Sequence, residues 1–206
     1  MIRLFYAPGA CSMAPHLVLE WIGAPYEAVR VRYGAPEFLT INPAGAVPAL
    51  DTGEGWTLTQ AGAILHYLAR RFPEAKLAPV DDPRAEAEAD RWSSFFTGDL
   101  HPSFYPVFMP DRYTTATDAA ALDAVREAGL ILVRKRLRLL DDHLRGKAFI
   151  LGDRRSVIDA YAFPMLRWAS AKLPEGLSDF AEARRHLEAM SADGAARKVL
   201  ADEGLA

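Results

Sequence analysis

The sequence predicts an α/β domain over residues 1–76, followed by an all-α domain over residues 82–206. Short strand-like segments bounded by turn residues occur only in the first part, where they alternate with helical spacing. At Asp82-Pro83, a capping aspartate precedes a proline suited to the first helical turn, and beyond it the apolar residues recur at helical spacing. The residues between the two parts have the composition of a linker.

The first domain is expected to contain four strands and two helices. In chain order these are strand 2–6, a helix through residues 17–22, strands 26–31, 47–50 and 56–58, and helix 60–72. Pro8-Gly9 ends the first strand and Gly23-Ala24-Pro25 ends the first helix, because glycine and proline interrupt regular structure. The order βαβ followed by ββα is that of a thioredoxin-like domain, a small mixed sheet with helices on its faces.

The second domain is expected to be a bundle of helices. A long helix carries one apolar stripe, formed by Leu130, Val133, Leu137, Leu140 and Leu144. Ser156 and Asp159 have the spacing of a capping box, which predicts another helix start at that point. Further helices are expected over residues 180–190 and 195–202.

Composition and charge exclude several classes of function. Half of the 206 residues are hydrophobic, a quarter are charged and the net charge is -3, with acidic and basic residues interleaved. These values indicate a globular protein and give no reason to expect binding to nucleic acid or to a membrane surface. The sequence has no apolar run of about 18 residues, no signal-peptide-like start and one cysteine, so we expect a cytoplasmic protein without a disulfide. No metal site is expected.

Cys11 is the first candidate for chemistry, because it lies where the first strand gives way to a helix. A sulfur at that position faces unpaired backbone N–H groups and the positive end of the helix dipole, which favour the thiolate. The alternative is a small buried hydrophobic residue, a common fate of a lone cysteine. Because residue 14 is alanine, a two-cysteine redox cycle is excluded, and any redox chemistry must take its second thiol from a ligand.

Two further segments suggest a site for a peptide. A cis bond between Val47 and Pro48 would turn the N–H and C=O of Val47 outward, where an extended peptide could pair with them; an ordinary strand-entry proline is the alternative. The N–H groups of residues 60–62 begin a helix and could hold a carboxylate, as any helix N-terminus could. Together with Cys11, these features fit a small tripeptide with a central cysteine.

Five segments, in order along nearly the whole chain, resemble the beta class of bacterial glutathione S-transferases. They are residues 4–12, 42–50, 58–64, 152–161 and 199–205. The first three are similar to the glutathione-site motifs of that class, the fourth to its helical-domain signature and the last to its ending. The resemblance implies glutathione as co-substrate and a homodimer in which the helices after Asp82 supply the contact.

The resemblance also implies roles for single residues. Cys11 matches the class cysteine that contacts the glutathione sulfur and can form a mixed disulfide with it. N–H donors near Cys11 and Ser12 would lower the pKa of the bound thiol, and His101 matches the histidine that reaches the active site from the helical domain. Val47 matches the residue whose backbone pairs with the cysteinyl part of glutathione, and Pro48 the family's cis-proline.

The remaining implied residues line the two substrate sites. Gln60 and Ala61 match the acidic-plus-serine pair that holds the γ-glutamyl group. The others are Tyr6, Ala10, Ala46 and Ser94 for glutathione, and Tyr105, Phe108, Met109, Tyr113 and Trp168 for an electrophile. Without the resemblance, His101 would be interpreted as an ordinary helix histidine, which is how His16, His66 and His143 are interpreted.

The chain departs from the class pattern in its polar contacts. Gln60 lacks the usual charge and Ala61 the hydroxyl, and losing one charge-assisted contact costs about 1.5–3 kcal/mol, roughly ten- to a hundredfold in affinity. Ser94 is shorter than the class asparagine that reaches the partner subunit's ligand. Residues 31–41 contain no match for the class lysine near the glycyl end, and Arg32 is the one stand-in.

Three functional hypotheses follow. The first is conjugation of the glutathione thiolate to hydrophobic electrophiles. The second uses the same site for thiol-disulfide exchange, peroxide reduction or reductive dehalogenation, with Cys11 forming the covalent intermediate. The third is a binding or regulatory protein without turnover, which Gln60 and Ala61 make credible.

Overall fold

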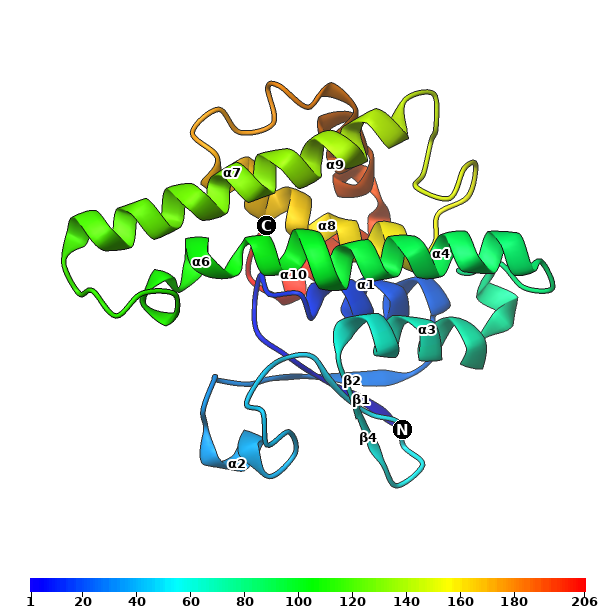
Figure 1. Ribbon diagram of the computed structural model, residues 1–206. Helices are drawn as coiled ribbons and strands as arrows, with labels where there is room; N and C mark the ends of the chain where they lie inside the picture. The colour runs from blue at the N-terminus through cyan, green and yellow to red at the C-terminus, as the bar shows by residue number, and fades with distance from the viewer.

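A mixed four-stranded sheet forms one layer of the molecule, and helices are stacked on one of its faces (Figure 1). The computed structural model describes residues 1–206. The elements of the first half are β1 (Ile2–Tyr6), α1 (Met13–Ile22), β2 (Tyr26–Arg30), α2 (Pro36–Leu39), β3 (Ala49–Asp51), β4 (Thr57–Thr59) and α3 (Ala61–Arg71). The strands lie in the order β2-β1-β3-β4, with β1 parallel to β2 and the other two pairs antiparallel. The predicted thioredoxin-like arrangement is confirmed.

The strand register brings three segments of the chain to the same end of the sheet. Phe5 of β1 lies opposite Ala49 of β3, and Ala49 lies opposite Thr59 of β4. Because neighbouring strands lie about 4.8 Å apart, this row of three residues spans about 10 Å. The residues that leave β1, enter β3 and follow β4 therefore emerge side by side.

Alternation along β1 divides its side chains between the two faces of the sheet. Leu4 and Tyr6 belong to the main core, which includes side chains of α1 and α3. Phe5 points to the opposite face, where it packs in a small cluster with Phe38 of α2 and with Val47. One face is thus covered by long helices and the other by the α2 segment (Figure 1).

The second half of the chain is helical. After the short turn η1 (Pro73–Ala75), its elements are α4 (Pro83–Phe95), the π-helical segment η2 (Phe96–Leu100), α5 (His101–Ser103), α6 (Tyr105–Phe108), the turn η3 (Pro110–Arg112), α7 (Ala119–Leu144), α8 (Val157–Lys172), α9 (Ala181–Ala192) and α10 (Gly194–Asp202). Asp82 accepts hydrogen bonds from the first turn of α4, and Ser156 forms the capping box of α8 with Asp159, so both predicted helix starts are confirmed. No helix combines the length and the apolarity that crossing a bilayer requires.

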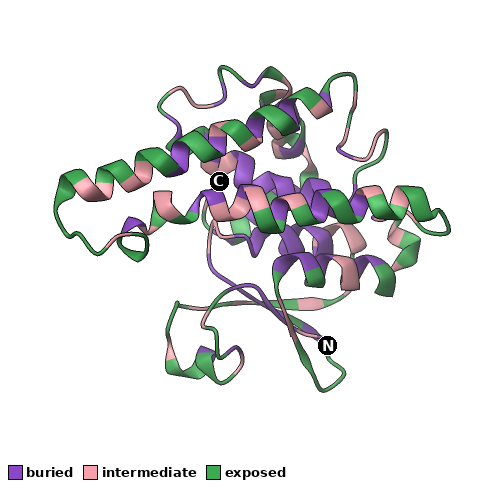
Figure 2. Ribbon diagram, in the orientation of Figure 1, coloured by how far each residue is buried: buried purple, intermediate pink, exposed green.

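Helices α1 and α8 lie at the centre of one continuous core. Both are almost entirely buried, while the long helix α7 shows its exposed side to solvent (Figure 2). The five residues of the apolar stripe predicted for this helix are all buried. One cluster of 43 buried residues includes side chains from both halves of the chain, so the helical half is fixed relative to the sheet.

Three differences between the observed and the expected elements bear on the site. β3 begins at Ala49 rather than at Val47, because Pro48 has no N–H to donate to the sheet. Helix α2 lies in a stretch expected to be only a connection. The π-helical turn η2 is not indicated by the sequence pattern, and it precedes Pro102, whose ring and missing N–H disfavour a regular α-helical turn.

Candidate active site

The loop from Ala7 to Ser12 carries Cys11 from β1 to α1. It begins with a turn closed by a hydrogen bond of 3.1 Å from the Ala10 N–H to the Ala7 C=O, in which Gly9 supplies a positive φ of 71°. The Ser12 hydroxyl bonds to both the N–H and the C=O of Ala7, at 3.2 Å each. Because Ser12 is fully buried, its side chain holds the loop, and only its backbone N–H points at the Cys11 sulfur.

Two side chains from the helical half hold this loop at Gly9. Nε1 of Trp168 donates to the Gly9 C=O at 2.7 Å, and the Gly9 N–H donates to Oε2 of Glu203 at 2.8 Å. The other carboxylate oxygen of Glu203 lies 3.0 Å from Nδ1 of His16, and both of these side chains are fully buried. The peptide groups on either side of Gly9 are therefore fixed by α8 and by the end of α10.

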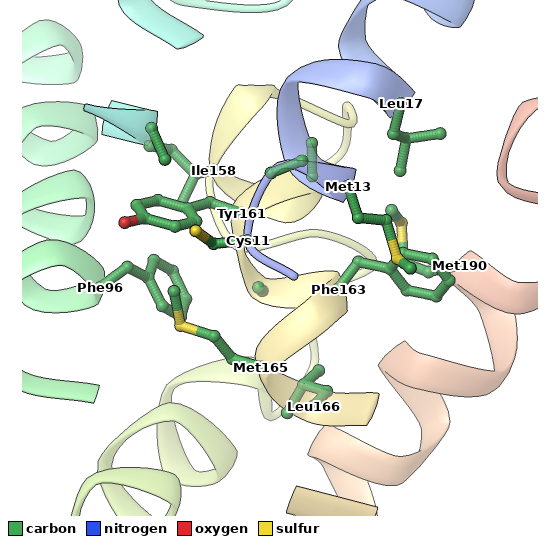
Figure 3. Packing of buried hydrophobic residues seen from close by; sticks show 14 of the residues in the cluster. Cys11, Met13, Leu17, Phe96, Ile158, Tyr161, Phe163, Met165, Leu166 and Met190 are labelled. Carbon is green, nitrogen blue, oxygen red and sulfur yellow. The ribbon is translucent and has the colours of Figure 1, made fainter. Parts of the chain in front are cut away.

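Cys11 lies at the start of α1, as predicted, but its thiol is buried and protonated. Sγ donates a hydrogen bond of 3.3 Å to the C=O of Val47 and lies beside the ring of Tyr161 (Figure 3). Burial raises the pKa of the thiol to about 12, although the N–H groups of Cys11 and Ser12 lower it. The expectation that the helix end favours the thiolate is wrong for the ligand-free protein, because desolvation outweighs those donors.

Alkylation of Cys11 should therefore be slow and strongly pH-dependent. A free cysteine has a pKa of about 8.5, so at pH 8 its thiolate fraction exceeds that of Cys11 about a thousandfold. Below pH 12 the Cys11 thiolate population rises with pH. The alkylation rate by iodoacetamide should thus keep rising from pH 8 to 11, whereas the same protein unfolded in urea should level off above pH 9. Mass spectrometry measures both rates, and levelling off near pH 9 in the folded protein would contradict the assignment.

Val47 presents one free backbone group at the end of the sheet, just before β3. Its bond to Pro48 is cis, as the sequence analysis proposed. The Asn42 side chain donates to the Ala46 C=O at 2.6 Å, and because the C=O and N–H of a trans peptide point in opposite directions, the Val47 N–H faces away from Asn42. That N–H has no partner in the protein. The Val47 C=O, expected to be free as well, instead accepts the Cys11 thiol.

The N-terminus of α3 offers unpaired N–H groups at the same end of the sheet as Val47. Gln60 has a φ of 72°, a conformation that costs a residue with a side chain about 1–3 kcal/mol. Its side chain makes no capping bond and the first turn of α3 contains no acidic residue, so the N–H groups of residues 61–63 are available to an anion. Helix α3 approaches the helical half closely at Gly62, where a Cβ would lie 2.9 Å from Cγ2 of Thr97.

The three features expected to form one site therefore meet at one end of the sheet. Cys11 contacts Val47 directly, and the register sets the entry to β3 beside the end of β4, where Gln60 follows. The row across these strands spans about 10 Å, which matches the reach of about 10 Å of three extended residues.

His101 lies in the helical half among aromatic side chains. The ring centroids of Tyr105 and Trp168 lie 5.1 and 5.2 Å from that of His101. Phe104 and Phe108 pack against Trp168 at 5.4 and 5.3 Å. Burial lowers the pKa of His101 to about 4, so the imidazole is neutral at physiological pH. It can donate or accept a hydrogen bond but supplies no positive charge.

Of the residues expected to contact an electrophile, three belong to this aromatic group. Tyr105 and Phe108 are partly exposed on α6, and Trp168 comes from α8. Met109 ends α6 and is half-buried, whereas Tyr113 ends η3 and is 52% exposed. Met109 and Tyr113 therefore follow the aromatic group along the chain, and their contact with an electrophile stays a prediction.

Tyr6 is directed toward the helical face of the sheet, and its implied contact with glutathione stays a prediction. Its hydroxyl donates to the C=O of Asp202 at 3.4 Å and its ring packs on His16 at 5.3 Å. Strand alternation directs Tyr6 to the same face as Leu4, toward α1 and α10; Cys11 belongs to the same core cluster, whereas Val47 packs in the cluster on the other face.

The other glutathione-site candidates differ in position. Ala10 packs against the small cluster that contains Val47. Ala46, the residue before Val47, is exposed. Ser94 is exposed on α4, where its neighbour Ser93, rather than Ser94 itself, faces α3 at Gly62. Ser94 is therefore not brought to the site within this chain, and its implied role toward a partner subunit stays a prediction.

Sequence reasoning missed three residues that shape the site. Glu203 accepts from the Gly9 N–H, His16 contacts the other oxygen of Glu203, and Asn42 orients the peptide of Val47. Asn42 had a local signal, since asparagine is typical of turns, and Asn42 Oδ1 accepts from the Ala44 N–H. Glu203 had none, because an acidic residue near a helix end is unremarkable until the fold buries it.

Comparisons with known proteins agree with this geometry. The model of the glutathione S-transferase N-terminal domain matches residues 1–70, and that of the C-terminal domain matches residues 123–190. The glutathione S-transferase GST-4.5 of Xanthomonas campestris pv. campestris is 37% identical over 99% of this chain and 100% of its own. A sphingomonad glutathione S-transferase solved in complex with glutathione has a TM-score of 0.86 at 33% identity, covering 99% of this chain and 100% of that one.

The beta-class glutathione S-transferase of Sphingomonas chungbukensis has a TM-score of 0.88 at 33% identity, with the same coverage of 99% and 100%. The likeness thus spans both halves of the chain. It extends to a bacterial member of the class that the sequence motifs resemble. The chain therefore belongs to the glutathione S-transferase family.

Proposed function

We propose that this protein is a glutathione transferase that conjugates the glutathione thiolate to hydrophobic electrophiles. The observation that carries the proposal is the meeting of the Cys11 loop, the free N–H of Val47 and the N-terminus of α3 at one end of the sheet. A relative of similar fold that binds glutathione supports the choice of ligand.

Backbone groups supply most of the proposed glutathione site. The Val47 N–H would pair with the cysteinyl part of the tripeptide, as one strand pairs with another. The N–H groups at the start of α3 would hold its carboxylate, with Gln60 providing polar side-chain contacts. The N–H groups of Cys11 and Ser12 point at the Cys11 sulfur, and a glutathione sulfur near that position would be stabilised as thiolate by the same donors.

The electrophile would bind against the aromatic group on α6 and α8. Tyr105, Phe108 and Trp168 offer an apolar surface beside His101, and the neutral imidazole provides a hydrogen bond without attracting counterions. Bound glutathione loses its thiol proton to solvent, and the thiolate attacks an electrophilic carbon; the new carbon–sulfur bond replaces the bond to a leaving group, such as the halide of an aryl halide, which departs with its electron pair. The proposal thus assigns glutathione to residues 1–76 and the electrophile to residues 82–206.

Cys11 is proposed as a contact to the glutathione sulfur rather than as a redox nucleophile. Its thiol is held by the Val47 C=O, and a pKa of about 12 keeps it protonated. A mixed disulfide requires a thiolate, so no observation favours the reductase or dehalogenase hypothesis over conjugation. A Cys11→Ser variant that loses disulfide or peroxide activity, but keeps conjugation, would support a separate redox role.

A homodimer and a cytoplasmic location complete the proposal. Ile131 and Leu139 on α7 are 57% and 53% exposed, and exposed apolar side chains on a helix after Asp82 suit a subunit contact. Light scattering should give twice the mass of one chain, and a stable monomer would count against the dimer. The free thiol and a glutathione substrate suit a reducing compartment.

A glutathione titration followed by a panel of electrophiles tests the proposed function. Calorimetric binding together with turnover of a chromogenic aryl halide is the expected result. Binding without turnover of any electrophile would support the non-catalytic alternative. Neither binding nor turnover at millimolar glutathione would overturn the proposal.

A further inference from the structure

Tyr161 lies close both to the aromatic group around His101 and to Cys11. It comes from α8, its side chain is buried, and Figure 3 shows its ring next to Cys11. On its other sides its ring centroid lies 5.8 Å from that of Phe96 and 6.2 Å from that of His101. Tyr161 is therefore a neighbour of both Cys11 and His101, two of the three residues expected to act in catalysis with Ser12.

The Tyr161 hydroxyl has one hydrogen-bond partner, Nδ1 of His101 at 3.3 Å. Either group could donate in principle, because both can carry a proton. The nitrogen lone pair of a neutral imidazole is a much stronger base than a phenol oxygen, so the favoured arrangement has the phenol donating to the nitrogen. Burial also raises the pKa of Tyr161, which keeps the phenol protonated.

This donation determines where the imidazole proton lies. With Nδ1 acting as acceptor, the single proton of a neutral ring must lie on Nε2. Nε2 of His101 has no hydrogen-bond partner in the protein, so its N–H is available to a ligand. The titratable groups that pack against the ring are Tyr161 of α8 and Tyr105 of α6, and burial raises the pKa of both phenols, so neither carries a charge at neutral pH.

We propose that Tyr161 is a positioning residue that holds the His101 proton on Nε2, so that His101 donates a hydrogen bond to the sulfur of bound glutathione. The inference rests on the proposed function for the identity of the ligand. Its first part, the tautomer of His101, is a property of the ligand-free protein and can be measured without any substrate.

The tautomer is tested by nitrogen-15 NMR of the histidine side chains in the ligand-free protein. The His101 signals are assigned by their absence in the His101→Gln variant. In the unmodified protein we expect a protonated Nε2 and an unprotonated Nδ1, and in Tyr161→Phe a mixture of both tautomers. A protonated Nδ1 in the unmodified protein, or an unchanged tautomer in Tyr161→Phe, would overturn the inference.

The catalytic consequence is tested by the pH profile of conjugation. Loss of one neutral hydrogen bond corresponds to about a fivefold to tenfold effect, so Tyr161→Phe should lower kcat/KM by that factor. The pKa of the bound glutathione thiol, measured by thiolate absorbance, should rise by up to about one unit. The KM for glutathione should stay within about twofold, because Tyr161 acts on the sulfur alone.

Two substitutions of His101 distinguish the contributions of its two ring nitrogens. The amide nitrogen of glutamine can occupy the place of Nε2, whereas that of asparagine occupies the place of Nδ1. His101→Gln should therefore retain more turnover than His101→Asn, and adding Tyr161→Phe to His101→Gln should cause no further loss. Equal loss in the two variants, or fully additive loss with Tyr161→Phe, would contradict the proposed coupling.

Tyr26→Phe is the matched control. Tyr26 is a half-buried tyrosine whose hydroxyl, like that of Tyr161, makes one side-chain bond, here to Glu20, but it lies on β2 away from His101. The control should alter neither the tautomer nor the pH profile. If the unmodified protein shows the expected tautomer but no turnover with glutathione, the proposed function fails while the assignment of the proton stands.

Discussion

Glutathione binding is expected to strengthen by at least ten- to a hundredfold when Gln60→Glu and Ala61→Ser are combined, because even one charge-assisted contact contributes about 1.5–3 kcal/mol. The glutamate would attract the amino group of the γ-glutamyl moiety, and the serine hydroxyl would donate to its carboxylate beside the N–H groups that begin α3. Gln60 already has a φ of 72°, and glutamate has similar backbone preferences, so the exchange adds no strain. Calorimetric titration measures the affinity.

The control for this gain is Thr57→Glu. Thr57 is exposed at the start of β4, so this variant adds the same charge to the same edge strand without adding it at the helix end. It should leave the affinity within about twofold, as expected for an exposed charge screened by salt. If the control strengthened binding as much as the double variant, the gain would come from long-range attraction by any added negative charge, and the proposed carboxylate position would be wrong.

Glu203→Ala is expected to destabilise the protein strongly. The change removes one partner of a fully buried pair, and such losses typically cost about 3–5 kcal/mol. It also removes the acceptor of the Gly9 N–H. For a chain of this length the corresponding fall in Tm is roughly 6–20 °C, which calorimetry or circular dichroism would detect. Turnover should fall even below the new Tm, since the Cys11 loop loses one of its two anchors at Gly9.

Asp202→Ala is the appropriate control for Glu203→Ala. The Asp202 side chain is 40% exposed and forms an ion pair only with Lys198, so its removal should change stability by less than about 1 kcal/mol. Glu203→Gln should be intermediate, because its amide oxygen can still accept from Gly9 while the buried charge is lost. Equal Tm values for Glu203→Ala and Asp202→Ala would contradict the role assigned to the buried carboxylate.

The sequence was sufficient for the features that depend on local patterns. The apolar stripe from Leu130 to Leu144, the cap at Asp82 and the box at Ser156 each act within a few residues, so their spacing predicts their structure. Cys11 and Val47 lie in contiguous motifs, and their contact follows from the order of the strands.

The sequence was insufficient where the chemistry depends on side chains that are buried by residues far away in the chain. Gly9 and Glu203 are 194 residues apart, and no local signal marks a glutamate that the fold will bury. For Cys11, the nearby N–H donors follow from its place at a helix start, whereas the desolvation that raises the pKa of its thiol depends on how deeply the fold buries it. For Tyr6, the alternation of β1 predicts the observed orientation toward α1, whereas its role toward glutathione rests on the resemblance alone.

The hydrogen bond between Gly9 and Glu203 makes the maturation of the site depend on the order of synthesis. A ribosome produces the Cys11 loop early, but the carboxylate that secures it is translated 194 residues later. The nascent chain can therefore form its sheet long before the loop acquires its final partners. A protease that trimmed the chain just before Glu203 would thus release the loop at the opposite end of the sequence.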